Sequence, residues 1–240
     1  MKILTSVHPH WLTNCYLICG KKGQGALLID AGAPVAAFEK ELKARQTPLA
    51  AILITHNHFD HIEHLASWRR RFPCPVYFHH QSPLLGALQA IPIGDNASFE
   101  AAGMKVRTLY TPGHTSDHLS FLINDKMLFT GDLLFKGSVG GTAEGTFAEL
   151  RRSIMDRVMP LSHSIKLYPG HGDLTSIGQE WQTNPFISAW RSPTLPTGSA
   201  CTIRGQAGQI LLIAKDYDGE EKAWVRINGQ DQIIPWPDSG

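Results

Sequence analysis

The sequence predicts a mixed α/β (α+β) fold built in layers. Short runs rich in Leu, Ile and Val alternate with segments of helical periodicity. Histidines and other polar residues cluster where the apolar runs end. The chain has 240 residues, 42% of them apolar and 18% charged, so it can bury a substantial core. Alternating strands and helices predict α/β layers, with the chemistry at the ends of the strands.

The first half of the chain alternates between strands and helices. The run NCYLIC and the run ALLI predict two paired strands joined by a turn at 21–25. A helix and a buried strand are expected next, and the histidine-rich run His56–His61 directly follows that strand. The expected strands are 14–19, 26–29, 51–54 and 76–78, and the expected helices are 34–45 and 62–72.

The second half repeats this order. A hairpin is expected around Asn124-Asp125, and a helix is expected to be interrupted near Asn184-Pro185. The expected strands are 104–110, 119–123, 127–130 and 165–168, and the expected helices are 146–159 and 177–190.

The C-terminal fifth differs in composition from the rest. We expect a main domain over 1–190, a Pro/Ser/Thr/Gly linker over 191–200 and a small β-meander over 201–240. Its three expected strands are 209–214, 222–227 and 232–236, and Asn228-Gly229 is a hairpin turn signal. Because three strands alone are marginally stable, the meander should pack on the main domain or on a partner chain. A homodimer is left open.

Composition excludes several classes of function. The formal net charge of +1 argues against nucleic acid as the main ligand. The four cysteines form no CxxC pair, which indicates free thiols in a reducing compartment. The N-terminus has no signal peptide, and no segment is apolar over the ~20 residues that span a membrane. We therefore expect a cytoplasmic protein with no membrane partner.

The run His56-Asn57-His58-Phe59-Asp60-His61 is the strongest chemical signal. It places four metal-ligating side chains within six residues, on a loop that leaves a buried strand. Imidazole and carboxylate bind Zn, Fe and Mn. His56 and His58 alternate along an extended loop and can face one ion, whereas Asp60 and His61 come after a bend and can face a second.

Three more candidate ligands follow other strands. His114 lies in TPGH, Asp132 in TGD and His171 in YPGHG, and a Pro-Gly turn before a histidine fixes where the imidazole points. The candidates now number seven, which is too many for one tetrahedral ion. Two ions ~3.5–4 Å apart that share one carboxylate can use them all.

These motifs resemble a known family, the metallo-β-lactamase-fold superfamily, and within it the glyoxalase II-like (hydroxyacylglutathione hydrolase-like) hydrolases. The matching segments are NCYLI, LIDAG, THNHFDH, TPGHTSDH, LFTGDLLF and YPGHGDLTSIGQEWQTNPF, within residues 1 to about 188. The resemblance implies a four-layer αβ/βα sandwich, with two mixed sheets face to face and helices outside. It also implies roles for the ligands: His56, His58 and His114 hold one metal, Asp60, His61 and His171 hold the second, and Asp132 bridges the two.

The resemblance implies a hydrolase with two divalent metal ions. Zinc is the first expectation, and iron or manganese are the alternatives. A hydroxide between the ions would attack a carbonyl carbon, and Asp60 and Asp132 would hold the metals and orient it. A thiolate leaves without a proton donor because thiol pKa values are about 8.5, so a thioester such as S-lactoylglutathione or a related ester is the expected substrate. Asp30 and His118 are expected to lie behind the ligands.

The chain departs from the family pattern where glutathione would bind. Gly141 and Ala143 stand where a Lys and a Tyr usually precede Glu-Gly-Thr, and a β-rich tail replaces the helical C-terminal domain. The residues that bind the substrate are therefore unknown at this stage. Two alternatives stay open: a lactonase with the same fold, and a mononuclear-iron persulfide dioxygenase.

Overall fold

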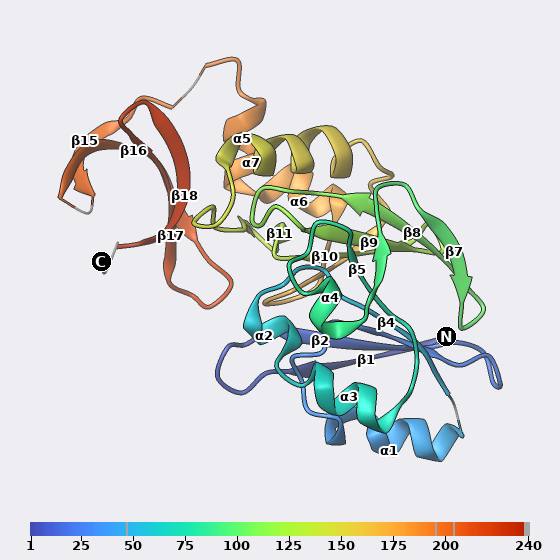
Figure 1. The fold of residues 1–240 in the computed structure, drawn as a ribbon. Helices are drawn as coiled ribbons and strands as arrows, with labels where there is room; N and C mark the ends of the chain where they lie inside the picture. Colours follow the sequence, from blue (N-terminus) through green and yellow to red (C-terminus); the bar gives the residue numbers. More distant parts are fainter. Residues whose placement is uncertain (47, 195, 204, 238–240) are drawn as a thin grey trace. The chain divides into compact units, whose positions relative to one another are not determined.

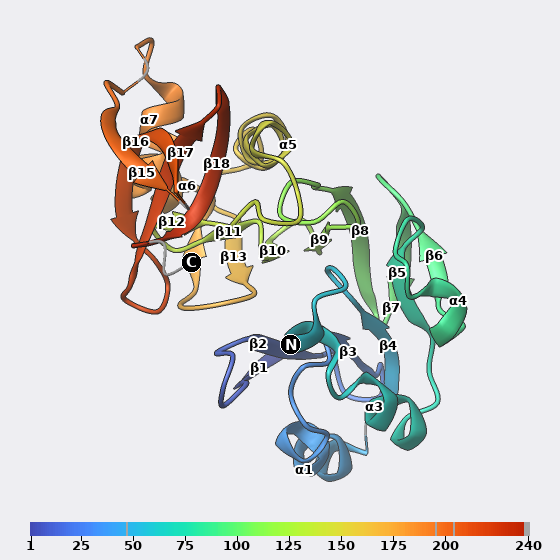
Figure 2. The ribbon, with the colours of Figure 1, turned by 60° about the vertical axis from the view of Figure 1, so that its left-hand side comes forward.

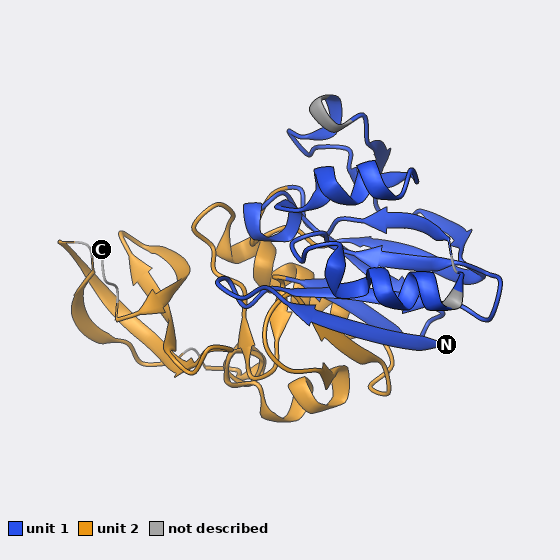
Figure 3. Cartoon of the chain, turned by 90° about the horizontal axis from the view of Figure 1, so that it is seen from below, with its two compact units in different colours: residues 1–110, 117–131 blue, residues 111–116, 132–240 orange. Residues whose placement is uncertain are grey.

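The computed structural model describes residues 1–46, 48–194, 196–203 and 205–237. The chain divides into two compact units (Figure 3), unit 1 with residues 1–110 and 117–131 and unit 2 with residues 111–116 and 132–240. The expected boundaries at 190 and 200 do not coincide with this division. The expected boundaries concern parts of the chain that fold independently, and they remain a prediction.

Unit 1 begins with a mixed sheet in the order β1-β2-β3-β4-β5-β6 (Figure 2). The first three strands pair antiparallel, and from β3 onward the pairing is parallel. Parallel neighbours need crossover connections, which the helices supply. The strands are β1 Lys2–Val7, β2 Asn14–Cys19, β3 Ala26–Ile29, β4 Leu49–Leu53, β5 Val76–His79 and β6 Ile91–Ile93.

Helices cover one face of this sheet (Figures 1 and 2). Phe38 and Leu42 of α1 and Trp68 of α3 pack with Leu17 and Ile52 of the strands in one buried cluster. The expected helix 62–72 is in fact two, because the ligand run itself forms the first turn and His64 separates it from the second. The helices of unit 1 are α1 Ala36–Arg45, α2 Phe59–Ile62, α3 Leu65–Arg71 and α4 Leu85–Leu88.

An antiparallel meander packs on the other face of the sheet. Tyr16 of β2 contacts Phe129 of β10 edge to face, with ring centroids 5.3 Å apart, and Tyr77 stacks on Phe99 at 5.0 Å. Asn124 and Asp125 both have positive φ, as the tight turn expected between β9 and β10 requires. The strands are β7 Ser98–Ala101, β8 Met104–Tyr110, β9 Leu119–Ile123 and β10 Met127–Gly131.

Unit 2 combines short strands with helices. The expected helix 146–159 changes at Ser153 into a π-helical turn, and the expected break at Asn184-Pro185 separates α6 from α7. The elements before the C-terminal sheet are β11 Leu134–Phe135, β12 Ser138–Val139, α5 Phe147–Arg152, η1 Ser153–Val158, β13 Lys166–Pro169, β14 Thr175–Ser176, α6 Ile177–Thr183 and α7 Pro185–Arg191.

The C-terminal sheet has four strands rather than the expected three. They pair antiparallel in the order β15-β16-β17-β18 (Figure 2), and β15 begins inside the expected linker. The alternation of residues 199–203 is weak because the strand is mostly exposed, so no clear strand pattern is present there. The strands are β15 Ser199–Ile203, β16 Gln206–Lys215, β17 Glu221–Ile227 and β18 Gln230–Trp236.

This sheet packs on the rest of unit 2, as three kinds of contact demonstrate. Trp224 stacks on Phe147 of α5 with ring centroids 5.1 Å apart. Thr142 and Ile233 exchange hydrogen bonds: the Thr142 amide donates to the Ile233 carbonyl at 3.0 Å, and the Ile233 amide donates to Thr142 Oγ1 at 2.9 Å. Buried Lys222 donates to the Val139 carbonyl at 2.8 Å. The sheet is therefore an integral part of the core of unit 2.

Across the described ranges, none of the helices combines the length and the apolar character that a bilayer span demands.

Lys222 offers a test of this packing. Its ammonium lies 2.7 Å from Asp216 Oδ2, and both side chains are more than 90% buried. Lys222→Met keeps most of the packing but leaves the carboxylate without its cation, so we expect the free energy of unfolding to fall by about 3–5 kcal/mol. Chemical denaturation measures this loss.

Lys215→Met is the matched control on the same sheet. Lys215 is 72% exposed and lies 3.6 Å from Glu221, so its loss should cost less than about 1 kcal/mol. Equal effects of the two substitutions would contradict the structural role given to Lys222.

Candidate metal centre

The ligand run of unit 1 lies on the loop after β4 and on the first turn of α2. The imidazoles of His56 and His58 have centroids 4.6 Å apart, and those of His56 and His61 are 4.2 Å apart. His61 Nε2 lies 3.5 Å from Asp60 Oδ2. All four predicted ligands of the run therefore gather at one place in unit 1.

The backbone behind this loop is closely packed. Gly32 lies directly against the ligand loop, because a Cβ there would be 1.8 Å from the Asp60 carbonyl oxygen. The Ala31 amide donates to the His61 carbonyl at 2.7 Å, and the Ala31 carbonyl accepts from the His64 amide at 3.0 Å. The LIDAG segment thus fixes the loop from behind.

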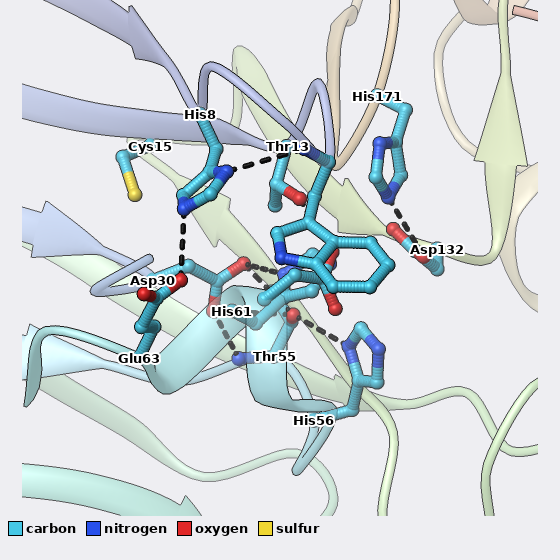
Figure 4. A network of polar contacts seen from close by, with 12 residues as sticks. His8, Thr13, Cys15, Asp30, Thr55, His56, His61, Glu63, Asp132 and His171 are labelled. Atoms are coloured by element: carbon cyan, nitrogen blue, oxygen red, sulfur yellow. Dashed lines mark hydrogen bonds and ion pairs between the residues drawn. The ribbon is translucent and has the colours of Figure 1, made fainter. Parts of the chain in front are cut away.

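Asp30 accepts hydrogen bonds from three groups (Figure 4). His61 Nδ1 lies 2.8 Å from Asp30 Oδ2, the Thr55 amide donates to Oδ1 at 2.8 Å, and the Thr55 hydroxyl donates to Oδ2 at 2.9 Å. A carboxylate only accepts, so His61 carries its proton on Nδ1 and leaves the Nε2 lone pair for a metal. Asp30 is where a carboxylate was expected behind the ligands, and its backbone φ of 58° is a left-handed value uncommon outside glycine.

The same reasoning extends to His56. The only proton of the Thr55 hydroxyl goes to Asp30, so Thr55 Oγ1 is left as an acceptor for His56 Nδ1 at 3.0 Å. His56 therefore also presents Nε2 with a lone pair. His118, the other residue expected behind the ligands, is fully buried, and its ring centroid lies 5.3 Å from that of His56.

Unit 2 holds the other three predicted ligands. Asp132 Oδ2 lies 3.6 Å from His114 Nε2 and 3.2 Å from His171 Nε2 (Figure 4 shows the second contact). His114 Nδ1 donates to the Gly141 carbonyl at 2.8 Å, because a carbonyl oxygen can only accept. The two imidazoles and the carboxylate therefore converge within unit 2.

The turn that carries His114 is held by helix α5 and the π-helical turn. Gly113 has φ of +133°, and a Cβ there would be 2.1 Å from the Leu150 amide nitrogen. The Ser153 hydroxyl donates to the Pro112 carbonyl at 2.7 Å. π-Helical turns are frequent at functional sites, and here the turn places Ser153 against the ligand-bearing loop.

The donor set in each unit fits a cation. With Nδ1 protonated, the Nε2 lone pair of His114 faces a carboxylate oxygen, and the lone pair of His61 faces Asp60 in the same way. Two lone pairs at 3.5–3.6 Å repel unless a positive charge lies between them. Imidazole nitrogen and carboxylate oxygen are suitable ligands for Zn, Fe or Mn.

Two further polar groups, which the sequence motifs do not mark, support the candidate ligands. The Thr13 hydroxyl donates to Asp60 Oδ2, and Thr55 connects Asp30 with His56. Single threonines carry no motif, so no signal in the sequence marks them.

Three large apolar side chains of unit 1, Trp11, Leu12 and Phe59, are 45–62% exposed. In the sequence, Phe59 lies between two predicted ligands, His58 and Asp60.

A second group of possible ligands, His8, Glu63 and His64, has a different explanation. The amides of His10 and Trp11 both donate to His8 Nδ1 at 3.2 Å, so the ring proton is on Nε2. That proton is donated to Glu63 Oε2 at 2.8 Å (Figure 4). His8 has no lone pair to offer at Nε2, so this group is a hydrogen-bond network.

His79 is a buried histidine at the end of β5. Its ring stacks on Tyr110 at 4.4 Å and 6°, and the Gln81 amide lies 3.4 Å from Nδ1. Burial, together with the neighbouring His80, lowers the pKa of His79 to about 4. His79 is therefore neutral at physiological pH.

The chain is similar in sequence to known proteins. Residues 9–171 match the family described as the metallo-β-lactamase superfamily. An uncharacterized protein of Mycobacterium tuberculosis is 33% identical over 207 residues, which cover 72% of this chain and 92% of the relative. Hydroxyacylglutathione hydrolase GloC of Haemophilus influenzae is 29% identical, covering 73% and 93%. A probable polyketide biosynthesis zinc-dependent hydrolase, BaeB of Bacillus velezensis, is 27% identical, covering 75% and 82%.

Solved structures give the same result. BLEG-1, a B3 metallo-β-lactamase, is similar with a TM-score of 0.67 and 30% identity, covering 78% of this chain and 100% of that one. ETHE1 from Myxococcus xanthus has a TM-score of 0.68 and 25% identity, covering 78% and 85%. A di-iron-bound form of TTHA1623 has a TM-score of 0.63 and 28% identity, covering 76% and 99%. The predicted mixed α/β fold class is thereby confirmed.

Asp30→Asn tests the orientation of His61. An amide is a weaker acceptor than a carboxylate and presents N–H groups to the same donors, so metal affinity should fall about 10–100-fold. Competition with a chromogenic chelator measures it. Asp125→Asn, at an exposed carboxylate paired with Lys105, is the control and should leave the affinity unchanged. An Asp30→Asn protein that binds metal like the wild type would contradict this role.

The lowered pKa of His79 predicts a dependence of stability on pH. The folded protein binds fewer protons than the unfolded chain between pH about 4 and 6.5, so stability should fall as the pH drops through this range. His79→Phe keeps the stack on Tyr110 and should flatten this fall in denaturant titrations. His163→Phe, at an exposed histidine, should retain it. A fall of the same slope in His79→Phe would contradict the assignment.

Proposed function

Because the chain belongs to the metallo-β-lactamase superfamily of metallo-hydrolases, we propose that it is a dinuclear metal-dependent hydrolase of a thioester or a related ester. The observation that carries the proposal is the arrangement of lone pairs. In each unit an imidazole Nε2 faces a carboxylate oxygen while its Nδ1 proton is held by an acceptor. Such an arrangement prepares ligands for cations before the cations bind.

The proposed ligands come from both units. One ion would be held by His56, His58 and His114, and the second by Asp60, His61 and His171. Asp132 would bridge the two, since its Oδ2 already faces His114 and His171. This assignment follows the family resemblance, and the geometry inside each unit supports it.

The chain's own residues would hold and orient the reacting groups. When bound, two divalent ions polarise a carbonyl oxygen and lower the pKa of water towards 7. Asp60 and Asp132 would hold these ions, and their carboxylate oxygens can also accept hydrogen bonds from groups bound beside them. Thr13 restrains Asp60 by its hydrogen bond, which limits the positions that the carboxylate can adopt.

A thioester or activated ester is the proposed substrate class. A thiolate can depart without a proton donor because its pKa is about 8.5, and the ligand set contains no evident general acid. The similarity to hydroxyacylglutathione hydrolase GloC supports this choice. S-Lactoylglutathione is the first compound to test. Gly141, which stands where relatives usually have a lysine before Glu-Gly-Thr, supplies only a backbone carbonyl.

Zinc is the proposed metal. The donor set of nitrogen and carboxylate oxygen suits it, and the similar BaeB is named as zinc-dependent, whereas TTHA1623 has a di-iron form. We also propose a cytoplasmic location, a small-molecule partner and no nucleic-acid ligand. The four cysteines, all within the described residues, are thiols rather than disulfides, which supports a reducing compartment.

The test is metal analysis of the purified protein together with a hydrolysis screen. We expect two ions per chain and cleavage of at least one compound among S-lactoylglutathione, other thioesters and lactones. Cleavage of lactones alone would favour the lactonase. One iron per chain with oxygen uptake would instead favour the persulfide dioxygenase and overturn the proposal.

His58→Ala provides the matching variant. Loss of one ligand should lower kcat/KM by at least about 100-fold, since losing a supporting group alone costs about 10–100-fold. His163→Ala, at an exposed histidine, serves as the control and should keep full activity. Unchanged hydrolysis by His58→Ala would refute a metal-dependent reaction at these ligands.

A further inference from the structure

The C-terminal sheet has no role in the proposed function so far, yet it reaches the ligands of unit 2. A cavity of about 200 Å³ is bounded on one side by two of them and on the other by the loop that joins β16 to β17. This volume equals that of about seven water molecules at ~30 Å³ each. Its lining includes His114, Asp132, Phe135, Tyr217, Asp218 and Glu220.

We propose that this loop, residues 216–220, is a wall of the substrate site and selects esters or thioesters that carry an alkylammonium group. The proposal rests on the proposed function, because it assigns the substrate class of the same site. No motif in the sequence marks the loop, and the ligand-bearing turns of unit 2 lie elsewhere in the chain.

The loop has a defined conformation. The Asp216 amide donates to the Glu220 carbonyl at 2.9 Å, and the Gly219 amide donates to the Asp216 carbonyl at 3.2 Å. The Tyr217 amide donates to Asp216 Oδ1 at 2.9 Å, and the Glu220 amide donates to Asp218 Oδ1 at 3.0 Å. A wall of fixed shape can discriminate between substrates because it pays little conformational entropy on binding.

The loop is anchored beside Asp132 by a buried cation. Lys222 joins Asp216 Oδ2 at 2.7 Å to the Val139 carbonyl at 2.8 Å, and its ammonium lies 5.0 Å from the centre of the Phe135 ring. Phe135 lies three residues after Asp132, and both line the cavity. The anchor therefore links the loop to the segment that carries the proposed bridging ligand.

Tyr217 brings the loop into contact with a proposed ligand. Its ring stacks on His171 with centroids 4.4 Å apart at 21°, and it meets Phe135 edge to face at 5.1 Å. Gly172 permits this approach, since a Cβ there would be 2.9 Å from the Tyr217 Cβ. Tyr217 is therefore held by His171, by Phe135 and by the Lys222 ammonium, which lies 5.7 Å from its ring centre.

The charge of the wall gives the substrate class. Four carboxylates of residues 216–221 line the cavity, and the one lining cation among the described residues, Lys222, is already bonded to Asp216. Glu221 lies 3.6 Å from Lys215, but Asp218 and Glu220 have no basic side chain within ion-pair distance in the described chain. Phe135 and Tyr217 already contact the Lys222 ammonium, which lies 5.0 and 5.7 Å from their ring centres, so the two carboxylates without a basic partner are what favours an alkylammonium group. When the carbonyl of such a substrate is bound at the metals, its alkylammonium group would lie against the loop.

Two probes of the same shape test the charge preference. Acetylthiocholine carries a trimethylammonium group, and S-(3,3-dimethylbutyl) thioacetate is its uncharged counterpart. For the metal-loaded protein we expect kcat/KM to be about tenfold higher for the charged thioester. In Asp218→Asn/Glu220→Gln this ratio should fall to about twofold or less. A wild-type ratio near one would overturn the proposal.

A matched control separates the wall from the overall charge. Glu100→Gln/Asp125→Asn removes two exposed carboxylates of unit 1 and should keep the tenfold ratio. If this variant loses the preference as much as the loop variant does, the preference does not arise at the loop and the proposal fails.

A binding measurement distinguishes failure of the wall from failure of the proposed function. The ketones in which CH₂ replaces sulfur, (4-oxopentyl)trimethylammonium and its uncharged counterpart, release no thiol and can be titrated by calorimetry. Tighter binding of the charged ketone by the wild type, with loss of this preference in the loop variant, supports the wall. If no thioester is hydrolysed in the same protein, only the hydrolase proposal fails. Hydrolysis without any charge preference in either assay overturns the wall alone.

Discussion

The proton on Nδ1 of three candidate ligands, His56, His61 and His114, is the constraint on which the candidate site depends. A histidine binds a metal through Nε2 only if its other nitrogen carries the proton, and a buried acceptor decides this. Asp30 provides that acceptor for His61, and the Gly141 carbonyl provides it for His114. Asp30 itself is held by Thr55, whose hydroxyl in turn accepts from His56. Much of the surrounding structure exists to keep these acceptors in place.

Close backbone packing holds the acceptor of unit 1 and the His114 turn of unit 2 in place. Gly32 lets the segment after Asp30 lie directly against the ligand loop, and Gly113 lets the His114 turn lie against helix α5. A side chain at Gly32 would move the acceptor-bearing segment away from the ligand loop, and a side chain at Gly113 would move the His114 turn away from α5. The glycines of the LIDAG and TPGH motifs therefore serve packing, and the histidine and aspartate residues serve the chemistry.

The C-terminal sheet connects the fold of unit 2 with the choice of substrate. The contacts that stabilise it, at Thr142, Phe147 and Lys222, also place its β16–β17 loop beside Asp132 and His171. Stability and specificity thus depend on the same buried groups in this part of the chain. A sheet packed in this way shares buried contacts with the preceding elements of unit 2.

The sequence by itself determined the fold class, the family and the candidate ligands, because these depend on local patterns: apolar runs, Pro-Gly-His turns and the run His56–His61. Single residues that act across long sequence separations could not be foreseen. Thr13 reaches Asp60, Thr55 reaches Asp30, and Tyr217 reaches His171 only after the chain has folded. Their types and spacing carry no signal, since a hydroxyl or an aromatic ring becomes a supporting group only through its tertiary neighbours. The tertiary structure alone decided which polar groups hold the ligands and which loop faces them.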